Sequence, residues 1–353
     1  MAKSTIHQVA HRAGVSTTTV SRTVNSPALV DAKTAVKVWA AITELEYYPN
    51  GQARSLVSGR TRLLGLIVSD ITNPFFPEVI KGFEDMAAEQ GFDILIGSTD
   101  YDTKKMARCV RRIVERRVDG VAIMTSEMDD HLVDQLARRN VPMVFLDVGV
   151  PREGIGNIVV NYESGINEAV AHLVSLGHRR IGFVSGPQHL KSAQIRRQAF
   201  LRSLSHYGIR EDDRLIVEGD HKVEGGLAAM TRLLQLSERP TAALASNDLT
   251  AIGMIRSIHC AGLTVPGDVS IVGFDDIWLA QFTDPPLTTV RLSRTELGQR
   301  AFHALVPSAG APAAKGEVIV DTKLIIRETT RAIRGESGGD RVLCPRRIRE
   351  FAP

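Results

Sequence analysis

The chain has 353 residues, of which 43% are hydrophobic and 24% are charged, a composition typical of about two to three soluble domains. It contains no run of about 18 apolar residues, and its first twenty residues lack the hydrophobic stretch of a signal peptide. A membrane protein is therefore not expected, and the expected location is the cytoplasm. Three widely separated cysteines (Cys109, Cys260 and Cys344) fit a reducing compartment and argue against a disulfide framework or a metal cluster.

The net charge of +3 is distributed unevenly along the chain. Residues 1–62 carry eight Lys/Arg against three Asp/Glu, and residues 331–353 carry six Arg against three acidic residues. The segment between them is therefore mildly acidic. A small basic head on an acidic body is typical of a module that binds nucleic-acid phosphates.

The first 48 residues have the signals of three short helices. Thr5 and Gln8 have the spacing of a capping box, Gly14 suits the left-handed residue that ends a helix, and Ser16 is a good N-cap for the next one. Two short helices separated by a glycine-containing turn are the helix-turn-helix pattern. A third helix is expected to begin at the N-cap Asp31, with the packing residues Val36, Trp39, Ala40 and Leu45.

The outward face of the second helix is rich in hydrogen-bonding side chains, namely Thr17, Thr18, Ser21, Arg22 and Asn25. Such groups reach base edges or phosphates in a groove of DNA. A three-helix bundle that uses this face for protein contacts is the alternative. The glycine turn and the basic surplus favour DNA.

Residues 49–61 are expected to form a hinge. Pro49 breaks the chain, Asn50 can cap the segment after it, and residues 51–58 are too few to form a stable helix alone. Leu56 in this segment is either linker filler or a wedge inserted between base steps in the minor groove.

The body, residues 62–330, repeats an α/β unit. Apolar runs at 63–68 and near Ile94, Val121, Val144, Ile181, Leu244 and Ile271 read as buried strands, and helical patterns separate them. This alternation predicts two doubly wound, parallel-sheet subdomains. We assign residues 62–160 plus 290–317 to the first subdomain and residues 161–288 plus 318–330 to the second.

Polar side chains follow several of these strands. Asp147, Asn247 and Asp275 come at carboxyl ends, where open α/β sheets bind ligands, and Phe76 and Arg196 lie close behind such ends. Carboxylates, an amide, an Arg and an aromatic ring suit a small polyhydroxyl ligand. Any single Asp here could instead be a helix N-cap.

The ordered motifs resemble the lac repressor/galactose repressor family over residues 5–331. They are Thr5-Ile6-His7-Gln8-Val9-Ala10, Ala13-Gly14-Val15-Ser16, Thr19-Val20-Ser21-Arg22, Tyr48-Pro49-Asn50, Ala53-Arg54-Ser55-Leu56, Asn73-Pro74-Phe75-Phe76, Leu176-Gly177-His178-Arg179, Ser246-Asn247-Asp248, Val272-Gly273-Phe274-Asp275-Asp276, Pro285-Pro286-Leu287-Thr288-Thr289 and Leu324-Ile325-Ile326-Arg327. The resemblance implies a homodimeric transcriptional repressor on a roughly palindromic operator, with a core similar to periplasmic sugar-binding proteins.

The resemblance also assigns roles to individual residues. Thr17, Thr18 and Arg22 fall at base-reading positions, Thr5, Asn50 and Ala53 at other positions of the DNA interface, and Leu56 at that of the central wedge. The positions that hold either phosphates or the helix itself are Ser16, Thr19, Ser21 and Asn25. The effector-contacting positions hold Phe76, Asp147, Ser192, Arg196, Asn247 and Asp275. His221 stands where several relatives have a stacking aromatic, and Trp278 could replace that ring or could simply pack.

The resemblance leaves alternatives open. The tail, residues 331–353, has no apolar heptads, so it cannot form a tetramer tether; it is expected to be disordered and the protein to be a dimer. The effector is expected to be a sugar, with a protein or non-sugar co-regulator as the alternative and a sugar-binding protein without a DNA role as a remote one. The sequence has no phosphate-binding loop, zinc motif or catalytic pair, so no enzyme activity, cofactor or metal is expected.

Overall fold

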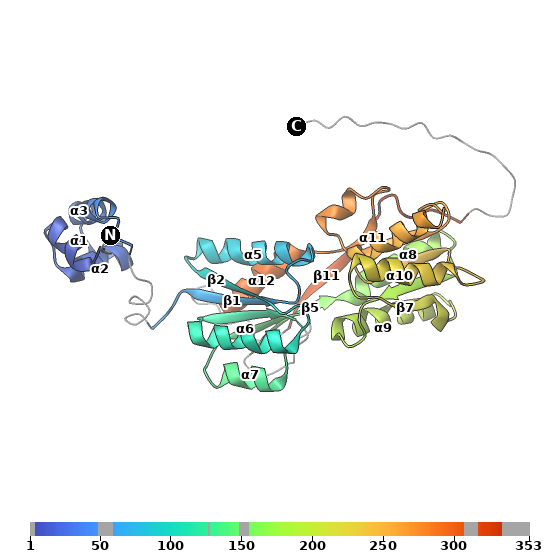
Figure 1. Ribbon diagram of the computed structural model, residues 1–353, viewed down its shortest axis with the longest axis horizontal. Helices are drawn as coiled ribbons and strands as arrows, with labels where there is room; N and C mark the ends of the chain where they lie inside the picture. The colour runs from blue at the N-terminus through green and yellow to red at the C-terminus, as the bar shows by residue number, and fades with distance from the viewer. Residues whose placement is uncertain (1–3, 49–58, 126–127, 148–154, 307–316, 334–353) are drawn as a thin grey trace, which may run out of the picture.

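The computed structural model describes residues 4–48, 59–125, 128–147, 155–306 and 317–333. Their elements form a small helical head and a larger α/β body, which confirms the predicted fold class (Figure 1). Within the described residues, no helix has the length and apolar character needed to cross a membrane.

The head consists of α1 (Ile6–Ala13), α2 (Thr17–Asn25), a 3-10 turn η1 (Pro27–Leu29) and α3 (Ala32–Glu44). The predicted capping signals are confirmed. Thr5 and Gln8 form the capping box of α1, and Gly14 ends it with φ 66° in the left-handed region. The side chain of Ser16 accepts from the backbone N–H of Thr19, and that of Asp31 accepts from Thr34.

Of the predicted packing residues of α3, Leu45 packs against the head core, but Val36, Trp39 and Ala40 do not. The head core buries Val38, Ala41 and Ile42, whereas Val36, Trp39 and Ala40 are exposed. Residues 35–42 are apolar at every position except Lys37, so helical periodicity alone does not single out one face. Packing against α1 and α2 decides which face of α3 is buried, and that face is adjacent to the predicted one.

The first subdomain is a parallel sheet in the order β2-β1-β3-β4-β5, which continues into β11. Its strands are β1 (Leu63–Val68), β2 (Asp93–Ser98), β3 (Gly120–Met124), β4 (Met143–Leu146) and β5 (Gly156–Asn161). Helices α5 (Phe75–Glu89) and α12 (Arg294–Leu305) pack against each other on one face, and α6 (Thr103–Arg116) and α7 (Asp130–Ala137) cover the other (Figure 1). Both sheet faces are thus buried, as the continuous apolar runs predicted.

The second subdomain repeats this plan with the strand order β10-β9-β8-β6-β7. Its strands are β6 (Ile181–Ser185), β7 (Ile216–Glu218), β8 (Ala242–Ala245), β9 (Ser270–Asp275) and β10 (Thr288–Leu292), with short 3-10 turns η2 (Asp213–Leu215) and η3 (Trp278–Gln281). Helices α8 (Tyr162–Ser175) and α9 (Lys191–His206) form one layer, and α10 (Val223–Leu234) and α11 (Asp248–Cys260) form the other (Figure 1).

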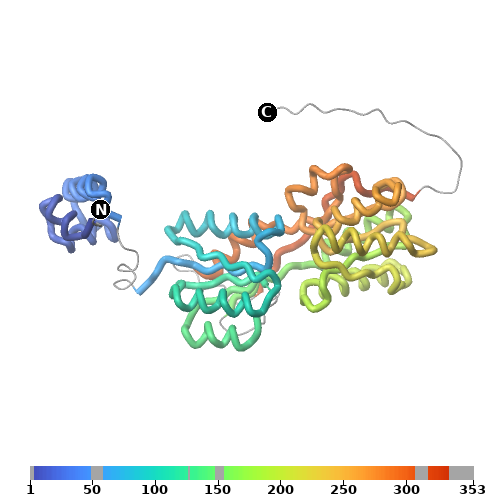
Figure 2. Tube along the Cα trace, viewed as in Figure 1, coloured from blue at the N-terminus to red at the C-terminus, as the bar shows by residue number. Residues whose placement is uncertain are grey.

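One long strand, β11 (Glu317–Ile325), belongs to both sheets. Residues 317–321 pair with β5 in parallel, and residues 322–325 pair with β10 in antiparallel. Strand β10 itself pairs with β9, so residues 290–292 lie in the second sheet, whereas the sequence predicts them in the first. Residues 318–321, predicted in the second subdomain, lie in the first sheet beside β5. The tube trace in Figure 2 shows the chain running between the two subdomains at this place. The chain therefore passes between the two subdomains at several adjacent places.

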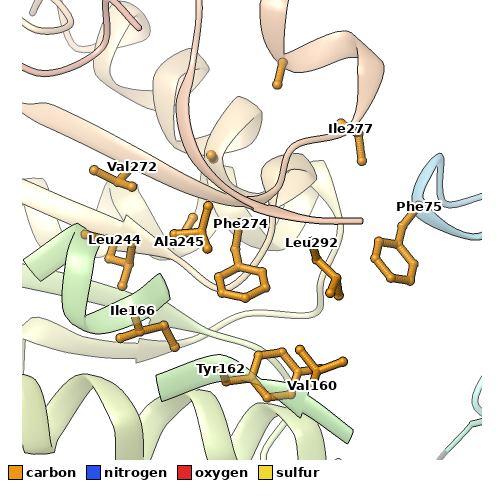
Figure 3. Close-up of a cluster of buried hydrophobic side chains, with 14 of the residues drawn as sticks. Phe75, Val160, Tyr162, Ile166, Leu244, Ala245, Val272, Phe274, Ile277 and Leu292 are labelled. Atoms are coloured by element: carbon orange, nitrogen blue, oxygen red, sulfur yellow. The ribbon is translucent and has the colours of Figure 1, made fainter. Parts of the chain in front are cut away.

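A continuous apolar core runs through both subdomains. Near the junction, Figure 3 shows Tyr162 and Phe274 side by side, with Phe75 approaching from the first subdomain. The rings of Tyr162 and Phe274 are 5.5 Å apart between centroids. This packing places the start of α8 against the end of β9, where the polar residues of the cleft begin.

Candidate DNA-binding and effector sites

The exposed part of α2 presents the side chains that the sequence assigned to base reading. Thr18 and Arg22 are exposed and Thr17 is half-buried, and within the described part of the chain Arg22 forms no ion pair. By contrast, Ser16 and Thr19 hydrogen-bond each other at 2.9 Å, and Asn25 donates to Ser21 at 3.3 Å. Thr17, Thr18 and Arg22 are thus available for contacts outside the head, whereas the second group stabilises the helix itself.

The hinge residues Asn50, Ala53 and Leu56 lie outside the described residues. The wedge role of Leu56 therefore stays a prediction.

A cavity lies between the two subdomains. Seven of the eight predicted effector residues line it: Phe76 and Asp147 from the first subdomain, and Ser192, Arg196, His221, Asn247 and Asp275 from the second. The remaining wall includes Ser69, Asn73, Phe75, Tyr101, Met124, Thr125, Leu146, Tyr162 and Leu190. Its polar groups therefore come from both sides of the cleft, and its apolar surface comes mostly from the first subdomain.

Trp278 is not among the cavity residues. It lies in η3, is 56% exposed and packs edge-to-face on Phe282, with the ring centroids 5.7 Å apart. The hypothesis that Trp278 takes the place of a stacking aromatic is thus not supported by its position.

Arg196 is the centre of the polar network. Its guanidinium donates to the carbonyl of Ser246 at 2.5 Å and to the hydroxyl of Tyr162 at 3.2 Å, and it lies over the rings of Tyr162 and Phe274. Burial acts to lower its pKa, but the negative groups around it, including Asp275 and Asp147, raise the pKa on balance. Arg196 is therefore held rigidly and stays charged.

Tyr162 connects the two walls of the cleft, a role that the sequence analysis missed. Its hydroxyl donates to Asp147 Oδ2 at 2.5 Å and accepts from Arg196, so it joins the end of β4 to α9. Asp147 Oδ1 and Arg196 Nε remain buried without a partner in the described structure. An unpaired acceptor and an unpaired donor in one cavity are groups that a hydroxylated ligand can satisfy together.

His221 and Asn247 support each other. The amide of Asn247 donates to the carbonyl of His221 at 3.0 Å, and its oxygen caps α11 by accepting from Thr250. His221 Nδ1 is 3.2 Å from the hydroxyl of Ser246, and burial lowers the pKa of the imidazole to about 3, so the ring is neutral. Asn247 thus shapes the wall, while His221 offers a neutral polar ring to the cavity.

Asp275 is positioned by a strained backbone, with φ 108°. Its carbonyl accepts from Arg294, which also pairs with Glu78 of α5 at 2.8 Å. Its carboxylate is buried, and burial raises its pKa to about 7 against the opposing effects of Arg196 and Arg294. The site therefore holds a carboxylate at an energetic cost, as expected where function rather than stability selects the residue.

This raised pKa predicts a pH-dependent stability. Because the folded protein binds the Asp275 proton more tightly than the unfolded chain, stability is greatest at low pH and falls as the pH rises from about 4 to about 7. Between pH 5 and pH 8, the wild type should lose about 2 kcal/mol of unfolding free energy relative to the variant Asp275→Asn, which has no carboxyl group to titrate. Urea denaturation of both proteins at both pH values measures this loss. If the difference between the two proteins did not depend on pH, the raised pKa of Asp275 would be contradicted.

Comparison with known proteins agrees with this architecture. Residues 5–50 match the family of bacterial regulatory proteins called the lacI family, and residues 170–330 match the periplasmic binding protein-like domain. The HTH-type transcriptional repressor PurR of Photobacterium profundum is 35% identical over 330 residues, covering 93% of this chain and 99% of that protein. A helix-turn-helix head on a two-subdomain ligand-binding core defines a transcriptional regulator, and this chain belongs to the LacI family.

Solved structures show the same likeness. The lac repressor dimer bound to operator and the anti-inducer ONPF matches with a TM-score of 0.85 and 32% identity, over 94% of this chain and 100% of that one. A LacI family regulator from Enterococcus faecium with bound ribose matches with a TM-score of 0.69 and 28% identity, over 77% of this chain and 100% of the other.

Proposed function

We propose that this repressor binds a roughly palindromic operator as a homodimer and that a neutral sugar in the cleft controls the binding. The observation that carries the proposal is the cleft itself, in which Asp147 from one subdomain and Arg196 and Asp275 from the other line one cavity. A ligand that contacts both walls stabilises the arrangement in which the walls are close, by its differential affinity for that state.

The charges of the cavity favour a neutral ligand. Asp147 and Asp275 face a single cation, Arg196, whose guanidinium is already engaged with Tyr162 and Ser246. An acidic or phosphorylated ligand would need a free bidentate guanidinium, and it would lie beside two acidic side chains, whose pKa values its charge would raise further. Hydroxyl groups both donate to carboxylates and accept from Arg Nε, so a polyhydroxyl compound suits the cavity better.

The structural relatives support this ligand class and the dimer. One was solved with ribose and another as an operator-bound dimer. A protein or non-sugar co-regulator is the alternative, and it predicts that no sugar changes operator binding.

Arg22 tests the DNA-reading head. Its exposed guanidinium lies on the α2 face predicted to enter the major groove, where a bidentate contact to one base is worth about 1–3 kcal/mol. We expect Arg22→Ala to weaken operator binding by that amount and to relax sequence preference at one position of each half-site. An operator is first selected from DNA of random sequence. Footprinting on it, with a panel of neutral sugars and with none, then measures the operator affinity and the base preference.

A matched control is Lys33→Ala, which removes one exposed cation from α3. It should weaken binding uniformly across sequences, if at all. If Arg22→Ala kept the wild-type base preference, the proposal that α2 reads the bases would be contradicted.

A further inference from the structure

Helix α6 of the first subdomain has an unusually basic surface. Its fourteen residues include six Lys or Arg and a single acidic residue, Glu115, and Arg117 follows directly. The exposed cations are Lys104, Arg108, Arg111, Arg112, Arg116 and Arg117. Lys105 pairs with Asp100, but none of these six forms an ion pair within the described part of the chain. The other face of the helix is apolar and packs on the sheet through Met106, Val110 and Ile113.

This arrangement is unfavourable for the helix. Arg108, Arg112 and Arg116 follow one another at i, i+4 spacing, and like charges at that spacing destabilise a helix by a few tenths of a kcal/mol per pair. Arg117 then ends the helix with φ 51° in the left-handed region, where glycine is the favoured residue. Cations at the last turn do interact favourably with the helix dipole, but one or two are enough for that. A face selected only for solubility would alternate these cations with Glu.

The basic end of α6 lies where the chain from the head enters the core. The Thr61 hydroxyl donates to the carbonyl of Arg117 at 2.9 Å. The backbone N–H groups of Thr61 and Arg62 donate to the two carboxylate oxygens of Asp119, at 2.9 and 3.0 Å. The C-terminal end of α6 is thus fixed to the first residues of the core after the DNA-binding segment.

We propose that Arg112, Arg116 and Arg117, which we call the α6 basic end, form a second DNA-contacting surface. It binds the phosphates of the duplex beside the bases read by α2, and it does so without sequence preference. Charge complementarity identifies duplex DNA as the partner, because the head on the same chain brings that polyanion to this end of the core. The inference rests on DNA binding by the head and extends it to the core.

The experiment uses the full-length protein and a 60-base-pair duplex of random sequence. Fluorescence anisotropy gives the association constant between 50 and 200 mM NaCl for the wild type and for Arg112→Gln/Arg116→Gln/Arg117→Gln. Each phosphate contact contributes about 0.9 to the slope of log K against log salt, so the triple variant should lose roughly 2 to 3 from that slope. Its affinity at 0.1 M salt should fall by about tenfold or more.

Two further variants separate the possible causes. Arg210→Gln/Arg232→Gln/Arg239→Gln removes three exposed cations from the second subdomain that form no ion pair with any residue the structure describes. It should leave the slope within about one unit of the wild-type value. Arg112→Lys/Arg116→Lys/Arg117→Lys keeps the charge and should retain the slope. If the glutamine triple does not fold, the single variant Arg116→Gln should still lower the slope by about 0.9.

The outcomes distinguish this inference from the function of the head. No DNA binding by the wild type would overturn both. Wild-type binding with an unchanged slope in the glutamine triple would overturn the inference alone, as would equal losses in the two glutamine triples, which would mean that only net charge matters.

Discussion

Replacing Arg196 by Met is expected to abolish effector binding, with a loss of affinity of more than about 100-fold. The guanidinium is the only cation among the residues that line the described cavity, and it holds Tyr162 and the carbonyl of Ser246 in place. Its removal also deprives Asp147 and Asp275 of the cation that most favours their charged forms. Breaking a buried charge network in this way costs about 3–5 kcal/mol of stability, reduced where a carboxylate takes up a proton.

Urea denaturation and calorimetry measure these two effects separately. The effector for calorimetry is the sugar that raises the unfolding temperature of the wild type in a panel of mono- and disaccharides. Arg197→Met, one residue further along α9, is the matched control and should change each quantity by less than about 0.5 kcal/mol. Retained affinity in Arg196→Met would place the effector elsewhere.

The second large effect is expected at Asp276, which ties the end of β9 to the crossing strands. Its carboxylate is 5% exposed and contacts Arg291 of β10 and Arg327 after β11, both at 2.6 Å. Arg327 is also largely buried, so Asp276→Ala leaves an uncompensated charge beside the strained Asp275. We expect a loss of about 3–5 kcal/mol in unfolding free energy.

The control for Asp276 is Asp213→Ala, which removes an exposed carboxylate from η2 and should change the unfolding free energy by less than about 0.5 kcal/mol. Equal effects of the two substitutions would mean that the Asp276 pairs contribute no more than surface charges do.

Much of the fold could be predicted from local chemistry. The long apolar runs predicted the central strands because strands buried on both faces need continuous hydrophobic residues, and the caps at Thr5, Ser16 and Asp31 predicted the helix starts of the head. Strand β7 was not predicted, because three residues carry no readable pattern. The path of β11 through two sheets depends on which strands it pairs with, and that is a property of the tertiary structure.

Prediction of the effector site from the sequence has the same limit, because contacts that depend on tertiary packing cannot be read from local patterns. Asp147, Arg196 and Asp275 could be assigned because they follow strands or belong to ordered motifs. Tyr162 could not, since it follows Asn161 at the start of α8 and only the packing of α8 against β9 turns its hydroxyl toward Asp147. The sequence offers Trp278 as a replacement for a stacking ring at the position of His221, but η3 places it outside the cavity.

The central claim is that the cleft and the DNA-reading head are coupled. Titrating the effector into the full-length protein with and without saturating operator measures this most directly. Linkage requires that operator change effector affinity by the same factor by which effector changes operator affinity, and a coupling of about 1–3 kcal/mol corresponds to roughly 5- to 150-fold. We predict a difference within that range, equal in both directions. Identical effector affinities with and without operator, for a sugar that binds the cleft, would contradict control of the head by this site.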